Sequence, residues 1–382
     1  MSFVNTVETV GDAALSNSII DRGISELNDN ISTSIGQYVF RDCKALANVN
    51  FPSVTSTATA AFWECTALAK AEFSACVAFD NNTFYGCSAL TALILRCADQ
   101  VCTLTGNLSG TPIASGTGYI YVPAALVDTY KAASGWSTYA SQIRAIEDYP
   151  EVCDPYSWVA VAKAIEAGTY ATVYKIGDLV PLDLGTEGVV NMQIAAFDAD
   201  ELADGSGYAP ISWVSKELLK TSHRMNPELV TNDDGTYQEG TGSIGGWAKC
   251  EMRTYLNDTI KPLIPSDVQV MIKPVTKNSD IYDTSGAMVD SIASADTVWI
   301  PSAREVAGGT SYESTGAIYS ALFADNTSRI KIKTGGTSGN EWPLRSAASG
   351  YNRQFVSCSY QGKVGRCLAS DTALSIALGF CT

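Results

Sequence analysis

The sequence predicts an α+β chain that is mostly β, with a short solenoid of repeats followed by a second globular domain. Three observations predict this. A motif recurs three times with a spacing of 22 residues, strand-like segments between Gly-, Ser- and Asn-rich loops dominate the C-terminal half, and 382 residues exceed the usual size of one domain. Hydrophobic residues make up 46% of the chain, which is enough for two separate cores.

The repeated motif is F-x-x-C-x-A-L. Its copies begin at Phe40, Phe62 and Phe84, and the 22-residue period lies in the leucine-rich repeat range. An alternating segment, typical of a short strand with one buried face, follows each copy at 48–51, 70–73 and 92–95. We therefore expect the strands to stack into a parallel ladder, with the Phe, Cys and Leu positions forming continuous buried columns.

This motif resembles the BspA-type leucine-rich repeats of bacterial surface and phage proteins. The resemblance covers about residues 35 to 95, with a weaker turn before it at 19–30. We assign residues 1–34 to an N-terminal segment or cap, and 35–147 to the solenoid with its C-terminal cap. The cap is expected as a strand at 118–123 and a helix at 124–133, with Trp136, Tyr139 and Ile143 continuing at helical spacing.

Residues 148–171 are expected to form a linker with a short helix at 157–167, because two prolines and three acidic residues lie between 148 and 155. The second domain then covers residues 172–382. A helix is expected at 247–260. Strands are expected at 174–180, 189–197, 268–275, 297–301, 341–346, 354–358 and 376–380.

Several motifs of this second domain occur together. They are Gly245-Gly-Trp-x-x-Cys-Glu-Met-Arg-x-Tyr-Leu-Asn257, Val298-Trp-Ile-Pro-Ser-Ala-Arg-Glu305, Ser328-Arg329, Trp342-x-Leu-Arg-Ser-Ala347 and Ala377-Leu-Gly-Phe-Cys381. In combination they resemble a domain common in gut bacteria and their phages. That domain is related to the C-type lectin fold of formylglycine-generating-enzyme-like proteins and of the variable proteins of diversity-generating retroelements. Pro343 stands where the family tends to have a second aromatic residue, which leaves the geometry of that strand open.

The resemblance implies that the C-terminal segment alternates framework residues with freely chosen ones. The framework residues are Phe355, Cys358, Gly362, Ala369, Ile376, Leu378 and Phe380. The implied ligand-binding residues are Tyr351, Asn352, Arg353, Ser357, Ser359, Tyr360, Lys363, Arg366, Asp371, Thr372 and Leu374. Tyr, Asn and Ser are favoured in antigen-binding loops, with Arg at their hot spots, because rigid rings and adaptable polar groups suit varied ligands. An ordinary solvated terminal loop is the alternative.

Neither a catalytic site nor a metal or cofactor site is predicted. His223 is the only histidine, and no G-x-S-x-G or Cys-His signature accompanies it. The acidic run with Asp198, Asp200 and Asp204 lacks the order of ligands in an EF-hand. The sugar-binding calcium motifs of C-type lectins, E-P-N, Q-P-D and W-N-D, are absent. Formylglycine generation would need a reactive cysteine pair, for which Cys358 and Cys367 are the only nearby candidates.

Composition narrows the class of partner. Charged residues are only 17% of the chain and the net charge is −15, so nucleic acid and anionic membranes are not expected partners. No basic region followed by an apolar run begins the chain, and no window approaches ~18 uninterrupted apolar residues, so we expect a soluble protein without a visible export signal. The eleven cysteines are expected to be free, buried thiols.

The predicted function is recognition of a protein or glycan ligand on a bacterial surface. Together with the two resemblances, the lack of a visible signal peptide favours a component of a phage tail or virion, held to other virion proteins through its N-terminal part. A bacterial surface adhesin is the alternative carrier. A tail-associated glycan hydrolase is the alternative from a different class, and it would require a deep acidic cleft with a pair of carboxyl groups.

Overall fold

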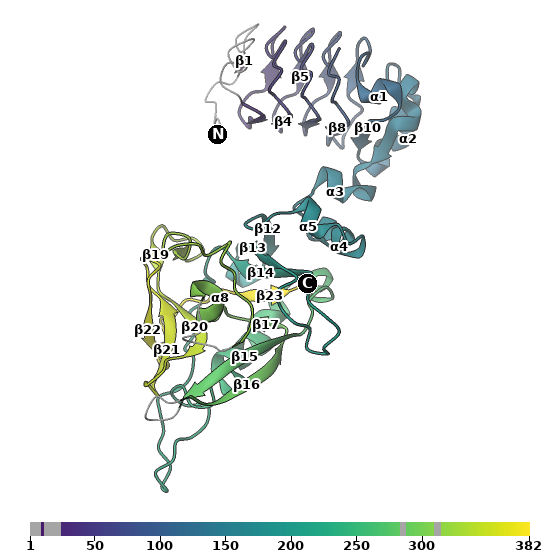
Figure 1. Ribbon diagram of the computed structural model, residues 1–382. Helices are drawn as coiled ribbons and strands as arrows, with labels where there is room; N and C mark the ends of the chain where they lie inside the picture. The colour runs from purple at the N-terminus through teal and green to yellow at the C-terminus, as the bar shows by residue number, and fades with distance from the viewer. Residues whose placement is uncertain (1–8, 11–23, 283–287, 309–314) are drawn as a thin grey trace. The chain divides into compact units, whose positions relative to one another are not determined.

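The computed structural model describes residues 9–10, 24–282, 288–308 and 315–382. The chain divides into two compact units, Met1–Pro155 and Tyr156–Thr382. Figure 1 shows the first unit as a stack of similar turns and the second as short strands, helices and long loops. Both units are mostly β, in agreement with the predicted fold class.

Two parallel ladders build the first unit. The longer sheet has the order β11-β10-β8-β6-β4-β2, and the shorter one has the order β1-β3-β5-β7-β9. The strands of the longer sheet are β2 Glu26–Asn28, β4 Asn48–Phe51, β6 Lys70–Phe73, β8 Ala92–Leu95, β10 Tyr119–Val122 and β11 Ile143–Ala145. Those of the shorter sheet are β1 Thr9–Val10, β3 Ser34–Ile35, β5 Ser56–Thr57, β7 Ala78–Phe79 and β9 Thr103–Leu104. The predicted parallel ladder is confirmed, and its register advances by 22 residues from β4 to β6 to β8.

The repeated Phe, Cys and Leu positions form the buried columns that the motif predicts. The ring centroids of Phe40 and Phe62 are 4.9 Å apart, and those of Phe62 and Phe84 are 5.5 Å apart. The cysteine thiols at 43, 65 and 87 are buried, and the Cys65 Sγ donates to the Phe40 carbonyl of the preceding turn. A small hydrophobic residue with a weak donor suits this position because the backbone above it has a carbonyl to satisfy.

A cap covers the C-terminal end of the solenoid. Its elements are α1 Pro112–Ser115, η2 Ala124–Leu126, α2 Val127–Ala132 and η3 Ser137–Gln142, together with β10 and β11. The Tyr130 hydroxyl accepts from the Cys102 N–H, and the Trp136 indole N–H donates to the Cys102 carbonyl. Side chains of the cap therefore provide hydrogen-bond partners for backbone groups of the last turn. Ile143 does not continue a helix as expected. It begins β11, where it pairs with Ile120 and adds a strand to the sheet.

The segment expected to be a linker is folded onto both units. Its elements are η4 Ile146–Asp148, α3 Pro150–Cys153, α4 Trp158–Glu166 and α5 Tyr170–Val173. Cys153 packs with Ile94 and Tyr121 of the first unit, whereas Val161 belongs to the core of the second. The boundary between the units therefore falls at Pro155. Most of the N-terminal segment predicted at 1–34, including part of the turn at 19–30, lies outside the described residues.

In its described residues, the second unit contains four sheets. The central sheet has the order β12-β13-β14-β23-β17, and the C-terminal strand β23 lies between β14 and β17. Its strands are β12 Leu179–Asp183, β13 Val189–Phe197, β14 Ile211–Ser215, β17 Val298–Trp299 and β23 Gly379–Cys381. The others are the pair β15 Val275–Tyr282 and β16 Met288–Asp296, the pair β18 Lys331–Ile332 and β19 Gly339–Asn340, and the three-stranded sheet β20 Trp342–Ala347, β21 Gln354–Cys358 and β22 Val364–Leu368.

The helices of this unit are short. They are η5 Gly185–Glu187, η6 Trp247–Lys249, α6 Glu251–Tyr255, η7 Leu256–Ile260, η8 Lys261–Leu263, α7 Ser266–Gln269 and α8 Ala303–Ala307. The helix predicted at 247–260 is present but divided into 3-10, α and π segments. The strand predicted at 268–275 is wrong, because α7 occupies its start and β15 begins only at Val275. Pro265 precedes α7 directly, a position that favours a helix start over a continuing strand.

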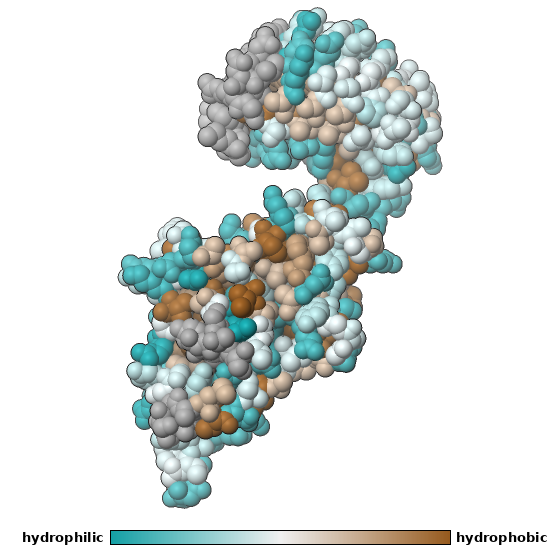
Figure 2. All heavy atoms as spheres, viewed as in Figure 1, coloured by the Kyte–Doolittle hydropathy of each residue, from teal (hydrophilic) through white to brown (hydrophobic). Residues whose placement is uncertain are grey.

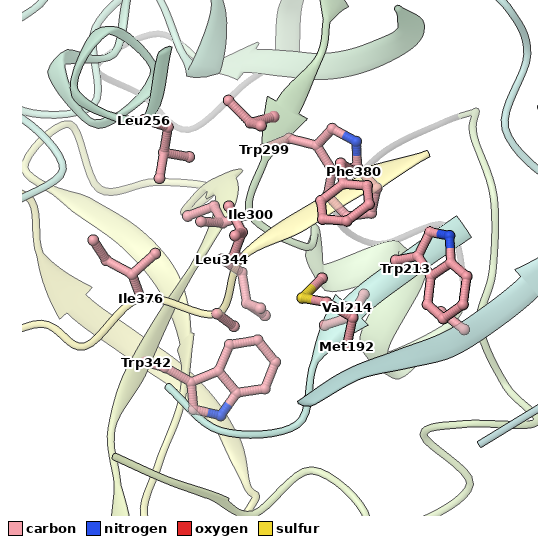
Figure 3. Close-up of a cluster of buried hydrophobic side chains, with 14 of the residues drawn as sticks. Met192, Trp213, Val214, Leu256, Trp299, Ile300, Trp342, Leu344, Ile376 and Phe380 are labelled. Atoms are coloured by element: carbon pink, nitrogen blue, oxygen red, sulfur yellow. The ribbon is translucent and has the colours of Figure 1, made fainter. Parts of the chain in front are cut away.

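The core of this unit joins residues from its whole length. Met192 and Trp213 from the central sheet, Leu256 from η7, and Trp342 from β20 all belong to one buried cluster, part of which Figure 3 shows. Gly379 lies against the ring of Trp299, where a Cβ would come within 2.3 Å of the indole. Strand β23 therefore needs glycine at this position to approach β17 closely.

Candidate functional site

The hairpin of β21 and β22 carries or flanks the predicted ligand-binding residues. Residues 354–358 pair with 364–368 in antiparallel register, and the turn between them runs from Ser359 to Lys363. Strand β21 is the central strand of its sheet, whereas β22 forms the outer edge (Figure 1). At the usual rise of about 3.3 Å per residue, the two ends of the hairpin are roughly 20 Å apart.

The predicted framework positions of this segment are buried. Phe355, Cys358, Ala369, Ile376, Leu378 and Phe380 belong to the hydrophobic core. Gly362 is also buried, and its φ of 73° favours glycine. A Cβ there would come within 1.7 Å of the Asn326 carbonyl oxygen, so the turn has no room for a larger residue.

Two predicted ligand-binding residues are inaccessible, and their assignment is wrong. Ser357 is 1% exposed and donates a hydrogen bond of 2.6 Å to Glu341, because the central strand β21 is covered on both faces. Leu374 is 2% exposed and packs in the core. The family resemblance implied that these positions are exposed, but β21 is a central strand, and Leu374 is an apolar residue that is buried with its neighbours.

One end of the hairpin gathers several of the remaining predicted residues. Tyr351, Asn352 and Arg353 precede β21, while Asp371 and Thr372 follow β22. Tyr351 is 44% exposed, and the Arg366 guanidinium lies 3.9 Å from the centre of its ring. Ser243 anchors this end by donating from its hydroxyl to the Tyr351 carbonyl and from its N–H to the Asn352 carbonyl. The structure thus brings the aromatic and cationic side chains together on a fixed backbone.

The opposite end is the turn with Ser359, Tyr360 and Lys363. The Ser359 hydroxyl accepts from the Gln361 and Lys363 N–H groups, and the Ser359 N–H donates to the Lys363 carbonyl. Ser359 therefore has a structural role that explains its presence without a ligand. Tyr360 is 62% exposed, which leaves its ring available at the tip of the hairpin.

A small hollow of about 70 Å³ lies beside the first end. Arg353, Leu368 and Ser370 line it from the C-terminal segment, and Pro227, Leu229 and Gly242 line it from an earlier loop. Sequence reasoning did not find Leu368, whose side chain is 52% exposed. An exposed leucine on an edge strand was not distinguishable by pattern from a framework residue.

The charge of this segment differs from that of the whole chain. Between 350 and 372 there are three cationic residues, Arg353, Lys363 and Arg366, and one acidic residue, Asp371. The chain as a whole has 25 Lys and Arg against 40 Asp and Glu. The hairpin is therefore a cationic area on an acidic protein, which favours an anionic ligand over a cationic one.

The histidine and the acidic run have structural partners. The His223 ring stacks on Tyr255 at 3.9 Å, its Nδ1 lies 2.7 Å from the Arg224 carbonyl oxygen, and its Nε2 lies 3.5 Å from Glu251. Asp200 is buried in an ion-pair network, and Asp204 caps its own turn by accepting from the Ser206 N–H. Over the described ranges, no three His, Cys, Asp or Glu side chains gather in a way that could hold a metal ion.

The network around Asp200 joins residues that are far apart in the sequence. The Lys277 ammonium lies 2.6 Å from Asp200 and 2.8 Å from Glu305, and Arg345 lies 2.6 Å from Glu305. Burial alone would raise the pKa of Glu305, but the charges of Arg345 and Lys277 outweigh it and hold that pKa below its usual value. Burial likewise opposes the charged form of Asp200, yet Lys277 lowers its pKa.

The network was missed from the sequence. Glu305 and Arg345 lie in two of the motifs that carry the second resemblance, but nothing near Lys277 marks it as buried. The four charges neutralise one another in the core, so the loss of any one leaves a buried charge without a partner, and none of them is exposed to a substrate.

Comparison with known families gives two matches that cover separate parts of the chain. Residues 8–103 match the BspA type leucine rich repeat region, in six copies, which confirms the resemblance seen in the first unit. Residues 218–377 match a domain of unknown function, DUF6273. The leucine-rich repeats indicate a surface or ligand-binding protein. None of the curated proteins matches this chain.

Two solved structures share short stretches of similarity. A leucine-rich repeat protein of T. pallidum is 20% identical over 31% of this chain and 52% of that protein, with a TM-score of 0.26. The pneumococcal vaccine antigen PcpA is 11% identical over 36% of this chain and 40% of that protein, with a TM-score of 0.19. The chain thus spans about half or less of the length of either protein. Within the part of the chain that the structure describes, no helix is long and apolar enough to cross a membrane.

Proposed function

We propose that this chain is a ligand-binding protein whose contact surface is the exposed part of the β21–β22 hairpin and its flanking residues. The surface comprises Tyr351, Asn352, Arg353, Ser359, Tyr360, Lys363, Arg366, Asp371 and Thr372. The ligand is a protein or glycan on a bacterial surface. The C-terminal unit has a C-type lectin-like fold that tolerates substitution at this surface.

One observation carries this proposal. The segment separates into a buried apolar framework and an exposed set rich in Tyr and Arg, and Arg366 stacks on Tyr351 within that exposed set. Aromatic and Arg side chains are the residues that most often carry binding energy at interfaces. A solvated terminal loop needs neither a rigid framework beneath it nor paired aromatic and cationic groups above it.

The proposed carrier, meaning the particle or cell that displays this chain, is a phage tail or virion. The N-terminal part would attach the chain to other proteins of that virion. A bacterial surface adhesin is the second candidate, and the leucine-rich repeats support a surface or ligand-binding protein without selecting between the two carriers. The visible face of the C-terminal unit in Figure 2 is mostly pale or hydrophilic with separate brown areas, which suits a protein that meets its ligand at a polar surface.

The proposal does not include catalysis. A glycan hydrolase needs two accessible carboxyl groups facing a substrate. The buried carboxylates Asp200 and Glu305 are paired with Lys277 and Arg345 and have no exposed surface to offer one. We therefore propose binding without a cofactor or metal. Measured cleavage of a glycan would instead favour the hydrolase hypothesis.

The test uses the full chain, labelled with a fluorophore, on a panel of intact bacterial cells and an array of bacterial surface glycans. Tyr351→Ser, Arg353→Ser and Tyr360→Ser are combined in one variant. Each side chain is expected to contribute about 1 kcal/mol or more, so the triple variant should bind more than ten-fold less tightly. Its melting temperature should be unchanged, because exposed substitutions usually alter stability by less than about 0.5 kcal/mol.

A matched control changes exposed residues of the same unit outside the hairpin. Tyr208→Ser with Lys249→Ser removes an aromatic and a cationic side chain that are both exposed. This control should bind like the unchanged chain. Equal binding by a normally folded triple variant would place the contact surface elsewhere, with the sheet face of the leucine-rich repeats as the next candidate.

A further inference from the structure

The outer edge of β22 presents backbone groups that no other strand of the described residues uses. The Ala369 N–H donates to the Arg353 carbonyl, and the Ser359 N–H donates to the Lys363 carbonyl. In this antiparallel register, the odd-numbered residues of β22 direct their N–H and C=O groups toward β21. The N–H and C=O groups of Val364, Arg366 and Leu368 therefore point away from β21.

Apart from the Leu368 carbonyl, which accepts from Asp371, these edge groups have no backbone partner among the described residues. The edge is also accessible, because Gly365, Arg366 and Leu368 are all exposed. A Cβ placed on Gly365 would meet nothing within 4 Å, so the face of the sheet at this residue is open. Glycine within an edge strand is a place where another backbone can approach closely.

Charge selects the kind of strand that this edge would accept. Arg366 projects from the middle of β22 and Lys363 directly precedes this strand, whereas Arg353 precedes the neighbouring strand β21, opposite Ala369. An added strand with an acidic side chain opposite Arg366 would place opposite charges on neighbouring strands, where they attract.

A second copy of β22 is a poorer occupant of the same edge. Antiparallel pairing of two β22 strands about their midpoint would set Arg366 opposite Arg366, which is repulsive. The hollow beside Leu368 and Arg353, which Glu228 also lines, adds room for one small side chain at the end of the path. Charge and space together favour an extended acidic peptide.

We infer that the ligand of this surface includes an extended acidic segment of a partner protein, which adds to the outer edge of β22 as a fourth strand of the β20-β21-β22 sheet. This inference rests on the proposed function and names the class of its ligand. Backbone hydrogen bonds give such an added strand its affinity, and the flanking cations with the hollow give it specificity.

The probe is a seven-residue peptide of alternating glutamate and valine with both ends blocked, titrated against the full chain. Arg366→Ala removes one cation and should weaken binding, with the loss diminishing at high salt. Arg366→Pro also removes the outward N–H, and it should weaken binding by a further factor of up to about ten. Because this N–H does not bond to β21, proline is compatible with the edge position.

Peptide variants test the backbone bonds independently of whether the proline variant folds. In an antiparallel addition, the glutamates lie opposite Val364, Arg366 and Leu368 and use their N–H groups toward β22. Methylating the glutamate nitrogens should abolish binding, whereas methylating the valine nitrogens should not. The reverse result indicates a parallel addition, and both results support an added strand. A peptide with lysine in place of glutamate should not bind.

Three results would overturn the inference: binding that both methylated peptides retain, equal affinity of the Arg366→Ala and Arg366→Pro variants, and a concentration-dependent dimer that Arg366→Pro abolishes. The last would make a second copy the occupant. The Tyr351, Arg353 and Tyr360 variant keeps the edge groups of β22. Loss of cell binding in that variant, together with no binding of the peptide to the unchanged chain, would refute the added strand and leave the proposed function intact.

Discussion

The solenoid and the C-terminal unit bury their side chains in different ways. In the solenoid the contacts of Phe40 with Phe62 occur again between Phe62 and Phe84, one repeat later. In the C-terminal unit Lys277 meets Asp200 and Glu305 once, across 77 and 28 residues of sequence. In a solenoid, each repeat contacts equivalent neighbours, so the same contact is made several times. A unique buried ion has no such equivalent, and its removal leaves its charged partners without a counter-charge.

The largest effect is therefore expected from Lys277→Met in the C-terminal unit. The change leaves the Asp200 and Glu305 carboxylates buried with only Arg345 to neutralise them. Breaking a buried ion pair in this way should lower the free energy of unfolding by about 3–5 kcal/mol. Scanning calorimetry of the full chain should show a lower transition for this unit and an unchanged one for the solenoid.

An exposed ion pair provides the matched control for this loss. Lys249 lies 3.4 Å from Glu239, and both side chains are more than half exposed. Lys249→Met should change the free energy of unfolding by no more than about 1 kcal/mol. Similar losses for Lys249→Met and Lys277→Met would show that burial does not set the strength of the Lys277 network.

The solenoid should respond evenly along its length. Leu46, Leu68 and Leu90 occupy the same motif position and are all fully buried. Replacing any one of them by Ala should cost about 2–5 kcal/mol, from lost burial and the cavity that remains. Urea unfolding of the three single variants tests this, and an unchanged midpoint for Leu68→Ala would contradict the stacked-repeat packing.

The same difference explains what the sequence could predict. The ladder of β4, β6 and β8 follows from the 22-residue spacing, because each repeat needs only its neighbours to bury its apolar face. The family resemblance also implied the framework residues of the C-terminal segment, among which Phe355 and Phe380 are buried. Strands β14, β16 and β22 were missed, and so was the burial of Ser357. The formation of these strands and the burial of Ser357 depend on which strands lie beside them. Contacts between residues distant in the sequence decide those neighbours.

A buried lysine gives the stability of the C-terminal unit a pH dependence of its own. Burial lowers the pKa of Lys331 to about 7, and its ammonium donates to the Ser215 carbonyl. The unfolded chain keeps a lysine pKa near 10.4, so between these values the unfolded state binds a proton that the folded state does not. Stability from this group should therefore increase as the pH rises from about 7 to about 10, by up to about 1.4 kcal/mol per pH unit.

Lys331→Met isolates this contribution, because other groups titrate in the same range. The difference in unfolding free energy between the unchanged chain and Lys331→Met, measured in urea at pH 7, 8 and 9, should move in favour of the unchanged chain. A constant difference across this range would show that Lys331 keeps its ordinary pKa in the folded protein.

The smallest effect is expected from a repeated contact on the surface of the solenoid. The rings of Trp63 and Tyr85, one residue after the motif Phe in successive repeats, stack with centroids 4.3 Å apart. Both side chains are partly buried, so each single change to Ala removes buried apolar area as well as the stacking contact. A double-mutant cycle with Trp63→Ala and Tyr85→Ala separates the two, and it should give a coupling energy of about 0.5–1.5 kcal/mol. A matched cycle of Trp63→Ala with Ser141→Ala, an exposed residue of the cap, should give none. Coupling in the first cycle alone would show that successive repeats stabilise one another through surface contacts as well as through their core. No coupling in either cycle would show that only the buried columns provide this stabilisation.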